Sequence, residues 1–291
     1  MKKKRVAVIG ASGFFGKPLF VELQKSFDVT GTFQNNHQQG LEPLDITDSS
    51  GINNFFSRFK PDIVVHLAAI VNVDECEKNP SKAFSVHVTG TKNIVNACQK
   101  NNARLLYFST DFVFDGQKGN YSESDSPNPI NEYGKTKLAG EKIVQKLSNS
   151  LIVRTSTPYS KDLESKKFIP FVIQNLSKGL PVNAFTDQIR SPSLVENVAE
   201  SVRMLLEKEV TGIVHVVGAS QVSMFDAALE VARVFGFDEN LVNPVECQSA
   251  NLAAVRPKNT GLYIQKALDL GLNLLSLHDG LVLVKKSVRF S

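Results

Sequence analysis

Apolar residues in the first half of the chain gather in short runs of strand length, separated by longer amphipathic stretches. The runs cover residues 5–9, 28–33, 62–67, 104–108 and 151–154. Most of them are apolar throughout rather than alternating, which is typical of strands that are covered on both faces of a parallel sheet. The pattern therefore predicts a doubly wound α/β fold with right-handed crossovers.

The stretches between these runs predict the helices that make the crossovers. Apolar residues recur at helical spacing over residues 17–26, 52–59, 80–101 and 132–147. Asp48 is an N-cap candidate ahead of the second of these helices, because its side chain can accept a hydrogen bond from the first helical turn.

The rhythm changes after about residue 155, where strands and helices no longer alternate regularly. Strands are predicted over 181–185 and 212–217, an irregular segment over 241–256, and helices over 168–177, 194–206, 225–235, 264–270 and 277–288. We predict a cofactor-binding domain over residues 1–155 and a smaller α/β substrate-binding domain over 156–291. The boundary is soft, because some later segments are expected to return to the main sheet.

Composition and charge exclude several classes of protein. The chain has 291 residues, of which 42% are apolar and 21% charged, and its formal net charge is +4. These values are typical of a globular protein, and the scattered basic residues do not indicate nucleic-acid binding. Three separated cysteines, the lack of an apolar run of membrane-spanning length and the lack of a metal-ligand spacing predict a cytoplasmic protein with no membrane contact and no metal.

A glycine turn between the first strand and the first helix is the first candidate binding site. Gly10, Gly13 and Gly16 are spaced three residues apart. Glycine lets the backbone approach a pyrophosphate, whose charge is favoured by the N–H groups at the start of the helix. The turn, Gly10, Ser12, Gly13, Phe14, Phe15 and Gly16, is therefore predicted to bind a dinucleotide.

The end of the second strand bears on the choice between NADP and NAD. The segment from Thr32 to Asn36 carries Gln34 and no acidic residue. A carboxylate at this place often accepts hydrogen bonds from the adenosine ribose of NAD. No carboxylate stands here to repel the 2′-phosphate of NADP. The sequence therefore favours NADP and leaves NAD as the alternative.

Tyr133 and Lys137 are spaced to lie on one face of a helix. A phenol has a pKa near 10, and a neighbouring ammonium group would lower it by stabilising the phenolate. Thr110, at the end of a predicted strand, can bind the same substrate oxygen. The three side chains are candidates for acid–base chemistry on a carbonyl or alcohol.

In these motifs the chain resembles the extended short-chain dehydrogenases/reductases, and among them the dTDP-4-dehydrorhamnose reductase group. The resemblance covers nearly the whole chain. The matching segments are Gly10–Gly16, Leu44–Asp48, Pro61–Ala69, Val73-Asp74, Ser109–Gly116, Gly119–Glu123, Pro129–Lys137, Gly140-Glu141, Arg154–Ser156, Asp187-Gln188, Ser191-Pro192 and Arg256–Asn259.

The resemblance implies a Rossmann-type cofactor domain, a C-terminal substrate domain, a cleft between them and a homodimer. It implies that hydride passes from NADPH to a nucleotide-linked 4-keto sugar while Tyr133 gives the proton. Further roles are implied for two groups of residues: the cofactor-binding Asp45, Ile46, Leu67, Ala68, Ala69, Tyr133 and Lys137, and the substrate-binding Thr110, Asp111 and Arg190.

Three positions depart from the reductase pattern. His87 stands where many relatives have Asn, and it either takes over the hydrogen bonding or is a tolerated change. Thr157 stands where the reductases usually have a Trp that touches the sugar. Arg190 resembles an epimerase Arg that meets the substrate diphosphate, and its alternative is a surface salt bridge. His66 and His215, in apolar strands, are expected to be core histidines.

Two alternative functions remain open at this point. One is a nucleotide-sugar epimerase, which needs only the same three side chains. The other is a non-catalytic NADP-binding regulatory subunit like that of methionine adenosyltransferase. An intact set of Thr110, Tyr133 and Lys137 favours an enzyme without deciding the matter.

Overall fold

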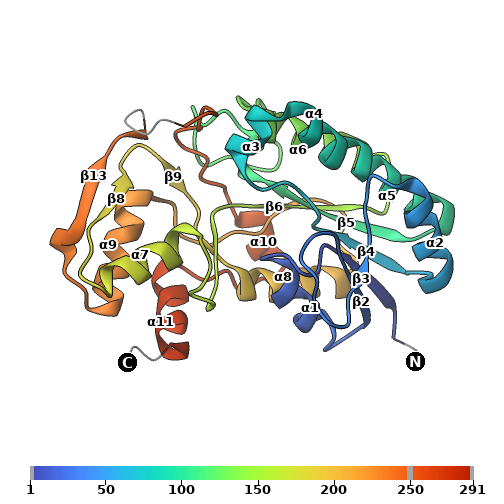
Figure 1. Ribbon diagram of the computed structural model, residues 1–291, viewed down its shortest axis with the longest axis horizontal. Helices are drawn as coiled ribbons and strands as arrows, with labels where there is room; N and C mark the ends of the chain where they lie inside the picture. The colour runs from blue at the N-terminus through green and yellow to red at the C-terminus, as the bar shows by residue number, and fades with distance from the viewer. Residues whose placement is uncertain (1–2, 248–251, 289–291) are drawn as a thin grey trace.

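A seven-stranded parallel sheet organises the molecule (Figure 1). The computed structural model describes residues 3–247 and 252–288. The strand order is β11-β6-β5-β4-β1-β2-β3, and every neighbouring pair is parallel. The prediction of a doubly wound parallel sheet is confirmed. Its strands are β1 (Arg5–Ile9), β2 (Asp28–Phe33), β3 (Glu42–Pro43), β4 (Ile63–His66), β5 (Arg104–Thr110), β6 (Leu151–Thr155) and β11 (Gly212–His215).

Helices cover both faces of this sheet, as continuous apolar strands require. One face packs on α1 (Gly16–Leu23) and α8 (Val195–Glu207), with a core that includes Val6, Leu19 and Val202. The other packs on α2 (Ser49–Phe59), α5 (Thr91–Asn101) and α6 (Glu132–Val144). The Asp48 side chain accepts from the backbone N–H of Ser50, so it caps α2 as predicted.

The later part of the chain forms a second apolar core beside the sheet. Its helices are α7 (Phe168–Leu176), α9 (Met224–Phe235) and α11 (Leu277–Ser287), which pack around the parallel pair β8 (Val182–Phe185) and β13 (Val242–Val245). The two-residue strands β7 (Pro158–Tyr159), β9 (Ile189–Arg190), β10 (Ser193–Leu194) and β12 (Val222–Ser223) complete this part. Helix α10 (Gln265–Asp269) instead packs on the core of the main sheet through Ala267.

The sequence analysis did not predict the five two-residue strands β3, β7, β9, β10 and β12, and two longer elements also differ from the prediction. Strand β13 lies inside the segment predicted to be irregular, of which residues 248–251 lie outside the described residues. Pro244 led to the prediction of an irregular segment here. A proline is nevertheless tolerated in a strand that pairs on one side only. Helix α3 (Val73–Lys78) was also missed, because its six residues are too few for a helical period.

The long helix predicted over residues 80–101 contains a change of winding. It consists of α4 (Pro80–Phe84), a π-helical turn (Ser85–Gly90) and α5. His87 and Gly90 are the buried residues of this π-helical turn. Such turns are often found at functional sites.

Over residues 3–247 and 252–288, no helix combines the length and apolarity needed to cross a bilayer.

Candidate active site

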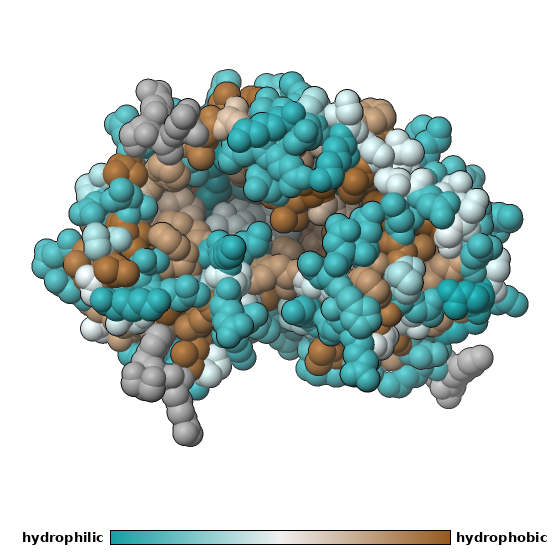
Figure 2. Space-filling view, viewed as in Figure 1, coloured by the Kyte–Doolittle hydropathy of each residue, from teal (hydrophilic) through white to brown (hydrophobic). Residues whose placement is uncertain are grey.

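A cavity opens at the carboxyl ends of the parallel strands, where α/β proteins bind their ligands. It has a volume of about 430 Å³, and the surface is hollowed at this junction between the two parts of the chain (Figure 2). Its wall includes most of the predicted site residues: Gly10, Ser12, Gly13, Phe14, Phe15, Gly16, Gln34, Ile46, Leu67, Ala68, Ala69, Thr110, Asp111, Tyr133 and Lys137.

The glycine turn has the geometry that the sequence predicts. Gly10 has a φ of +91°, a conformation that a residue with a side chain rarely adopts. A Cβ atom at Gly16 would collide with the backbone oxygens of Gly10 and Ala11, so the helix begins directly against the turn. Because the helix lies so close to the turn, backbone atoms form this edge of the cavity.

Thr110, Tyr133 and Lys137 converge on the cavity from two neighbouring elements. Thr110 ends β5, and α6 begins where Asn131 accepts a hydrogen bond from Gly134 N at 2.9 Å. Lys137 Nζ donates to the carbonyl oxygen of Phe108 at 2.7 Å. Burial lowers the pKa of Lys137 to about 7, so this ammonium group titrates near neutrality.

The pKa of Tyr133 corrects one expectation. Burial raises this pKa above its ordinary value, and the hydrogen bond with Thr110 opposes the rise only in part. The expected lowering by Lys137 is not found, since removal of the phenolate from water is the largest effect. Tyr133 is therefore held as a protonated phenol, which is the form that an acid catalyst needs.

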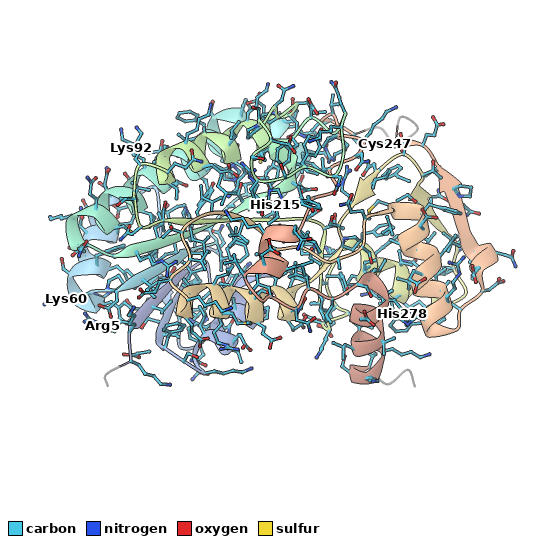
Figure 3. The ribbon with its side chains drawn as sticks, turned by 180° about the vertical axis from the view of Figure 1, so that it is seen from behind. Arg5, Lys60, Lys92, His215, Cys247 and His278 are labelled. Atoms are coloured by element: carbon cyan, nitrogen blue, oxygen red, sulfur yellow. The ribbon has the colours of Figure 1, made fainter. Side chains whose placement is uncertain are left out.

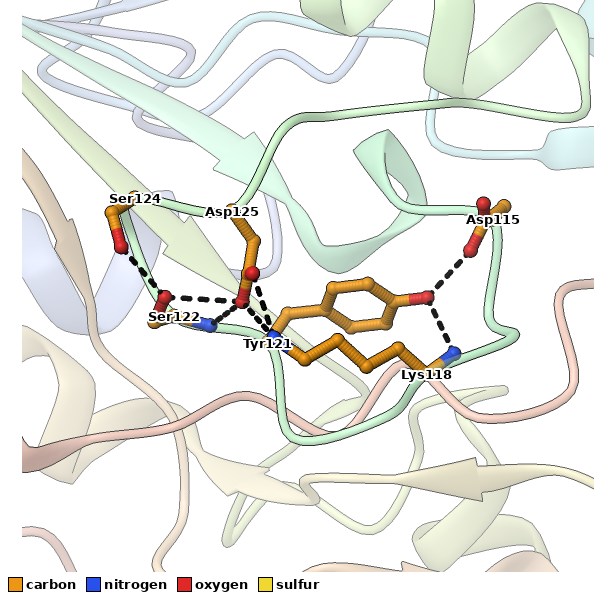
Figure 4. A network of polar contacts seen from close by, with 6 residues as sticks. All are labelled: Asp115, Lys118, Tyr121, Ser122, Ser124 and Asp125. Carbon is orange, nitrogen blue, oxygen red and sulfur yellow. Dashed lines mark hydrogen bonds and ion pairs between the residues drawn. The ribbon is translucent and has the colours of Figure 1, made fainter.

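A polar loop connects β5 to α6, and a network of side-chain contacts holds it (Figure 4). The Tyr121 hydroxyl donates to Asp115 at 2.5 Å and accepts from Lys118 N at 3.1 Å. The Asp125 carboxylate accepts from Ser122 N at 2.7 Å and pairs with Lys118. These bonds fix a loop that Gly, Ser and Asp would otherwise leave adaptable.

Asp45 and Arg190 are the two predicted site residues outside the cavity wall. The Asp45 carboxylate accepts from the N–H and hydroxyl of Thr47, at 2.8 and 2.7 Å. Arg190 is 3% exposed, so the alternative of a surface salt bridge is wrong. Its guanidinium donates to the carbonyl oxygens of Ile189, Lys258 and Pro257.

The histidines expected to be core residues are buried. His66 and His215 are 1% and 0% exposed, and burial lowers the pKa of each to about 3. His215 lies in the middle of the molecule (Figure 3), where its Nδ1 is 3.1 Å from the carbonyl oxygen of Tyr263. Both rings are therefore neutral packing residues.

His87 takes part in hydrogen bonding, which answers the question that the sequence left open. Its Nε2 accepts from Ile70 N at 2.9 Å, so the ring hydrogen must lie on Nδ1, which donates to Thr136 Oγ1 at 2.8 Å. Burial, followed by the charge of Lys137, lowers the pKa of His87 to about 3. The neutral ring thus joins the segment after β4 to the helix that carries Tyr133.

Replacing His87 by Ala is expected to lower the free energy of unfolding by about 2–3 kcal/mol, because it leaves Ile70 N–H unpaired and opens a cavity. Urea unfolding measures the loss. The matched control is His278→Ala, since that ring is 63% exposed and its loss should cost about 0.5 kcal/mol or less. Equal losses for the two variants would contradict a joining role.

The cavity also contains residues that sequence reasoning did not assign. Ser109 Oγ and Thr155 Oγ1 are buried without a hydrogen-bond partner and line the wall. Lys167 lines it from the second part, with Nζ 5.6 Å from the centre of the Phe14 ring. No local pattern marks Lys167, because it meets the glycine turn only through the fold.

Thr157, which stands at a reductase Trp position, has strained backbone. Its φ is +33°, which is rare for a β-branched residue, and it lines the cavity. Strain of this kind gathers at functional sites.

The cavity fits a nicotinamide dinucleotide. Gly10, Gly13 and Gly16 border the cavity without side chains, and Ser109 and Thr155 line its wall with buried hydroxyls that have no partner among the described residues. Lys137 and Lys167 are the basic residues on the described wall, and Asp111 is its acidic residue. Anionic phosphates can therefore enter without meeting a row of carboxylates.

Comparison with known proteins identifies the family of this chain. The model of the RmlD substrate binding domain matches residues 4–287. The chain belongs to this family. It is 32% identical over 284 residues to the probable low-salt glycan biosynthesis reductase of Haloferax volcanii, covering 94% of this chain and 95% of that protein.

Two further family relatives differ in their described activity. The chain is 32% identical to the rat (Rattus norvegicus) methionine adenosyltransferase 2 subunit beta, covering 92% of this chain and 83% of that protein. The structure of a Bacillus anthracis dTDP-4-dehydrorhamnose reductase in complex with NADP is 32% identical, with a TM-score of 0.89 and coverage of 99% and 100%. Sequence identity alone does not separate an enzyme from a subunit.

Proposed function

We propose that the protein is an NADPH-dependent reductase of a nucleotide-linked 4-keto sugar, similar to dTDP-4-dehydrorhamnose reductase. The observation that carries this proposal is the convergence of Thr110, Tyr133 and Lys137 on the cavity that the glycine turn borders. The related reductase bound to NADP supports the choice of cofactor. A homodimer in the cytoplasm is part of the same proposal.

The chemistry follows from the protonation of the site. NADPH, when bound, supplies the hydride. Tyr133 is held as a phenol and would give its proton to the carbonyl oxygen, while Thr110 would hold that oxygen in reach. Lys137 would bind the nicotinamide ribose and, when charged, stabilise the phenolate that remains.

Lys167 is the side chain that we assign to the substrate phosphates. It faces the cavity, carries a positive charge and has no ion pair among the described residues. Arg190, the sequence candidate for this contact, has its donors on backbone carbonyl oxygens instead. The diphosphate contact is therefore assigned to Lys167, because the other cation on the wall, Lys137, donates to Phe108 O.

The direct test is to mix the protein with NADPH and dTDP-4-keto-6-deoxy sugar and to follow the absorbance of the reduced nicotinamide. A substrate-dependent decay, together with a reduced sugar nucleotide in the product, supports the proposal. NADPH binding without any decay over a panel of nucleotide sugars would refute it.

The cofactor preference gives a separate prediction. Gln34, Asn35 and Asn36 line the cavity after β2 and bring no carboxylate. NADPH should therefore bind more tightly than NADH, and Asn35→Asp should shift the ratio of the two Kd values about tenfold toward NADH by repelling the 2′-phosphate. Fluorescence titration measures both constants, and Asn35→Ser controls for loss of the amide. Tighter binding of NADH by the wild type would contradict the prediction.

A regulatory subunit is the second candidate. It is favoured by the 32% identity to the methionine adenosyltransferase beta subunit over 92% of this chain. The reductase is preferred because Thr110, Tyr133 and Lys137 meet on the wall of the cavity that the glycine turn borders, an arrangement that a surface-binding role does not require. The epimerase alternative shares the fold and would appear in the same assay as a changed sugar without net oxidation of NADPH.

A further inference from the structure

The ammonium group of Lys137 lies on the ring of a buried tyrosine other than Tyr133. Tyr107 belongs to β5, and it is 1% exposed. Lys137 Nζ is over this ring, 4.0 Å from its centre. The negative face of an aromatic ring attracts a cation at this distance, and most strongly where water is excluded. The Tyr107 ring is therefore a buried partner of the Lys137 ammonium group.

A glycine on α6 makes room for this ring. A Cβ atom at Gly140 would collide with the hydroxyl oxygen of Tyr107, so a larger residue there would displace the ring. The His66 ring lies 5.4 Å from the Tyr107 ring, centre to centre. The Tyr107 ring is therefore in contact with both α6 and the neighbouring strand β4.

The three hydrogens of the ammonium group have separate directions to take. One is donated to the carbonyl oxygen of Phe108 at 2.7 Å. The Tyr107 ring lies against the same group, and Lys137 also lines the cavity, so a hydrogen is left for a ligand. Tyr107 and Phe108 are consecutive residues of β5, so one strand provides both contacts.

We propose that Tyr107 is a positioning residue, whose ring keeps Lys137 in its charged form at the wall of the cavity. A buried ammonium group has lost its water, and the single carbonyl oxygen of Phe108 replaces that water only in part. The negative face of the ring adds a stabilisation that acts on the cation and not on the neutral amine. The catalytic role of Lys137 rests on the proposed reductase function, whereas the contact between Tyr107 and Lys137 does not.

The surroundings of Lys137 set the direction of the expected change. Burial lowers the pKa of Lys137 to about 7, and the carboxylate of Glu141 opposes this fall. The ring of Tyr107 favours the charged form as well. A ring with a weaker negative face should therefore lower the pKa of Lys137 further, and less of this side chain would be charged at pH 7.

Other titratable groups that face Lys137 keep their protonation near neutral pH. Burial raises the pKa of Tyr133 and of Cys76 on α3, so both stay protonated. Burial also lowers the pKa of His66 and His87 to about 3, so both rings stay neutral. The titration of Lys137 can therefore be followed by itself between about pH 5 and pH 9.

The first test changes the electrons of the ring and keeps its shape. Tyr107→Phe keeps the aromatic face, and Phe analogues with one, two or three ring fluorines are then placed at position 107. Each fluorine withdraws electrons from the face and weakens its attraction for a cation. Lysine labelled with ¹³C at Cε reports the pKa of Lys137, and Lys137→Arg identifies the resonance.

The pKa of Lys137 should change little in Tyr107→Phe. It should then fall stepwise with fluorine number, by about one pH unit with three fluorines, which corresponds to the loss of a buried cation–π contact. A pKa that does not depend on fluorine number would overturn the proposal, because packing alone would then explain the position of the ring.

Fluorination at Phe56 is the matched control. Phe56 is 1% exposed and belongs to the same apolar core as Tyr107, but it lies on α2. The same analogues at position 56 should leave the pKa of Lys137 unchanged. An equal fall would show a general effect on the core and would refute the role of Tyr107.

The second test measures what the charge of Lys137 does in the reaction. The kcat of NADPH-dependent reduction should fall as rising pH removes this charge, and three fluorines at position 107 should move the fall about one pH unit lower. KM for the nucleotide sugar should stay within about twofold. If the pKa moves and the kcat profile does not, the catalytic role of Lys137 fails and the role of Tyr107 stands. Because the ¹³C measurement needs no turnover, it decides the proposal even for a protein that reduces no sugar.

Discussion

Replacing Tyr133 by Phe is expected to lower the rate of NADPH-dependent reduction about 10²–10⁴-fold, the usual contribution of a positioned acid. The variant removes only the hydroxyl, and the ring contacts with His87 and Phe112 remain. The Kd for NADPH should therefore stay within about twofold. Single-turnover kinetics and a cofactor titration measure the two quantities.

Tyr263→Phe is the control for this variant, because Tyr263 is 44% exposed and should keep the wild-type rate. Full turnover by Tyr133→Phe would show that another group gives the proton. If the wild type is itself inactive on the substrate panel while both proteins bind NADPH, the regulatory-subunit reading is favoured.

A large loss of stability is expected when the buried ion pair between α6 and β6 is broken. Arg154 donates from Nε and Nη2 to the two carboxylate oxygens of Glu141, at 2.9 and 2.8 Å, and both side chains are about fully buried. Glu141→Gln leaves the guanidinium without its counter-charge, beside His215. The free energy of unfolding should fall by about 3–5 kcal/mol, as measured by urea unfolding.

The control is an exposed pair of the same type. Arg58 and Glu42 are 2.5 Å apart, with side-chain exposures of 65% and 38%. Glu42→Gln should cost about 1 kcal/mol or less, because water screens such a pair. Similar losses for the two substitutions would mean that burial does not set the strength of the Arg154–Glu141 pair.

Local patterns in the sequence were enough to predict the main sheet and to select the glycine turn, Tyr133 and Lys137, which line one cavity. The glycine turn lies within seven residues, and Tyr133 and Lys137 are one helical turn apart, so both can be read without the fold. The apolar strands also predicted a parallel sheet, since burial on both faces leaves a continuous apolar run.

Contacts between distant segments could not be predicted in this way. Lys167 meets Phe14, and Thr260 meets Asp111, across more than a hundred residues. Arg190 was singled out by its type, but its surroundings decide what it binds. The raised pKa of Tyr133 likewise depends on burial, which a spacing of four residues does not reveal.

The strand order has a consequence for synthesis of the chain. Strand β11 pairs with β6, and α8 covers the same face as α1, although both β11 and α8 come after residue 190. While the chain emerges from the ribosome, β6 would have an open edge, and an open edge invites pairing with other strands. The first 155 residues are therefore exposed to aggregation until β11 arrives, and a truncated chain ending there would keep that hazard permanently.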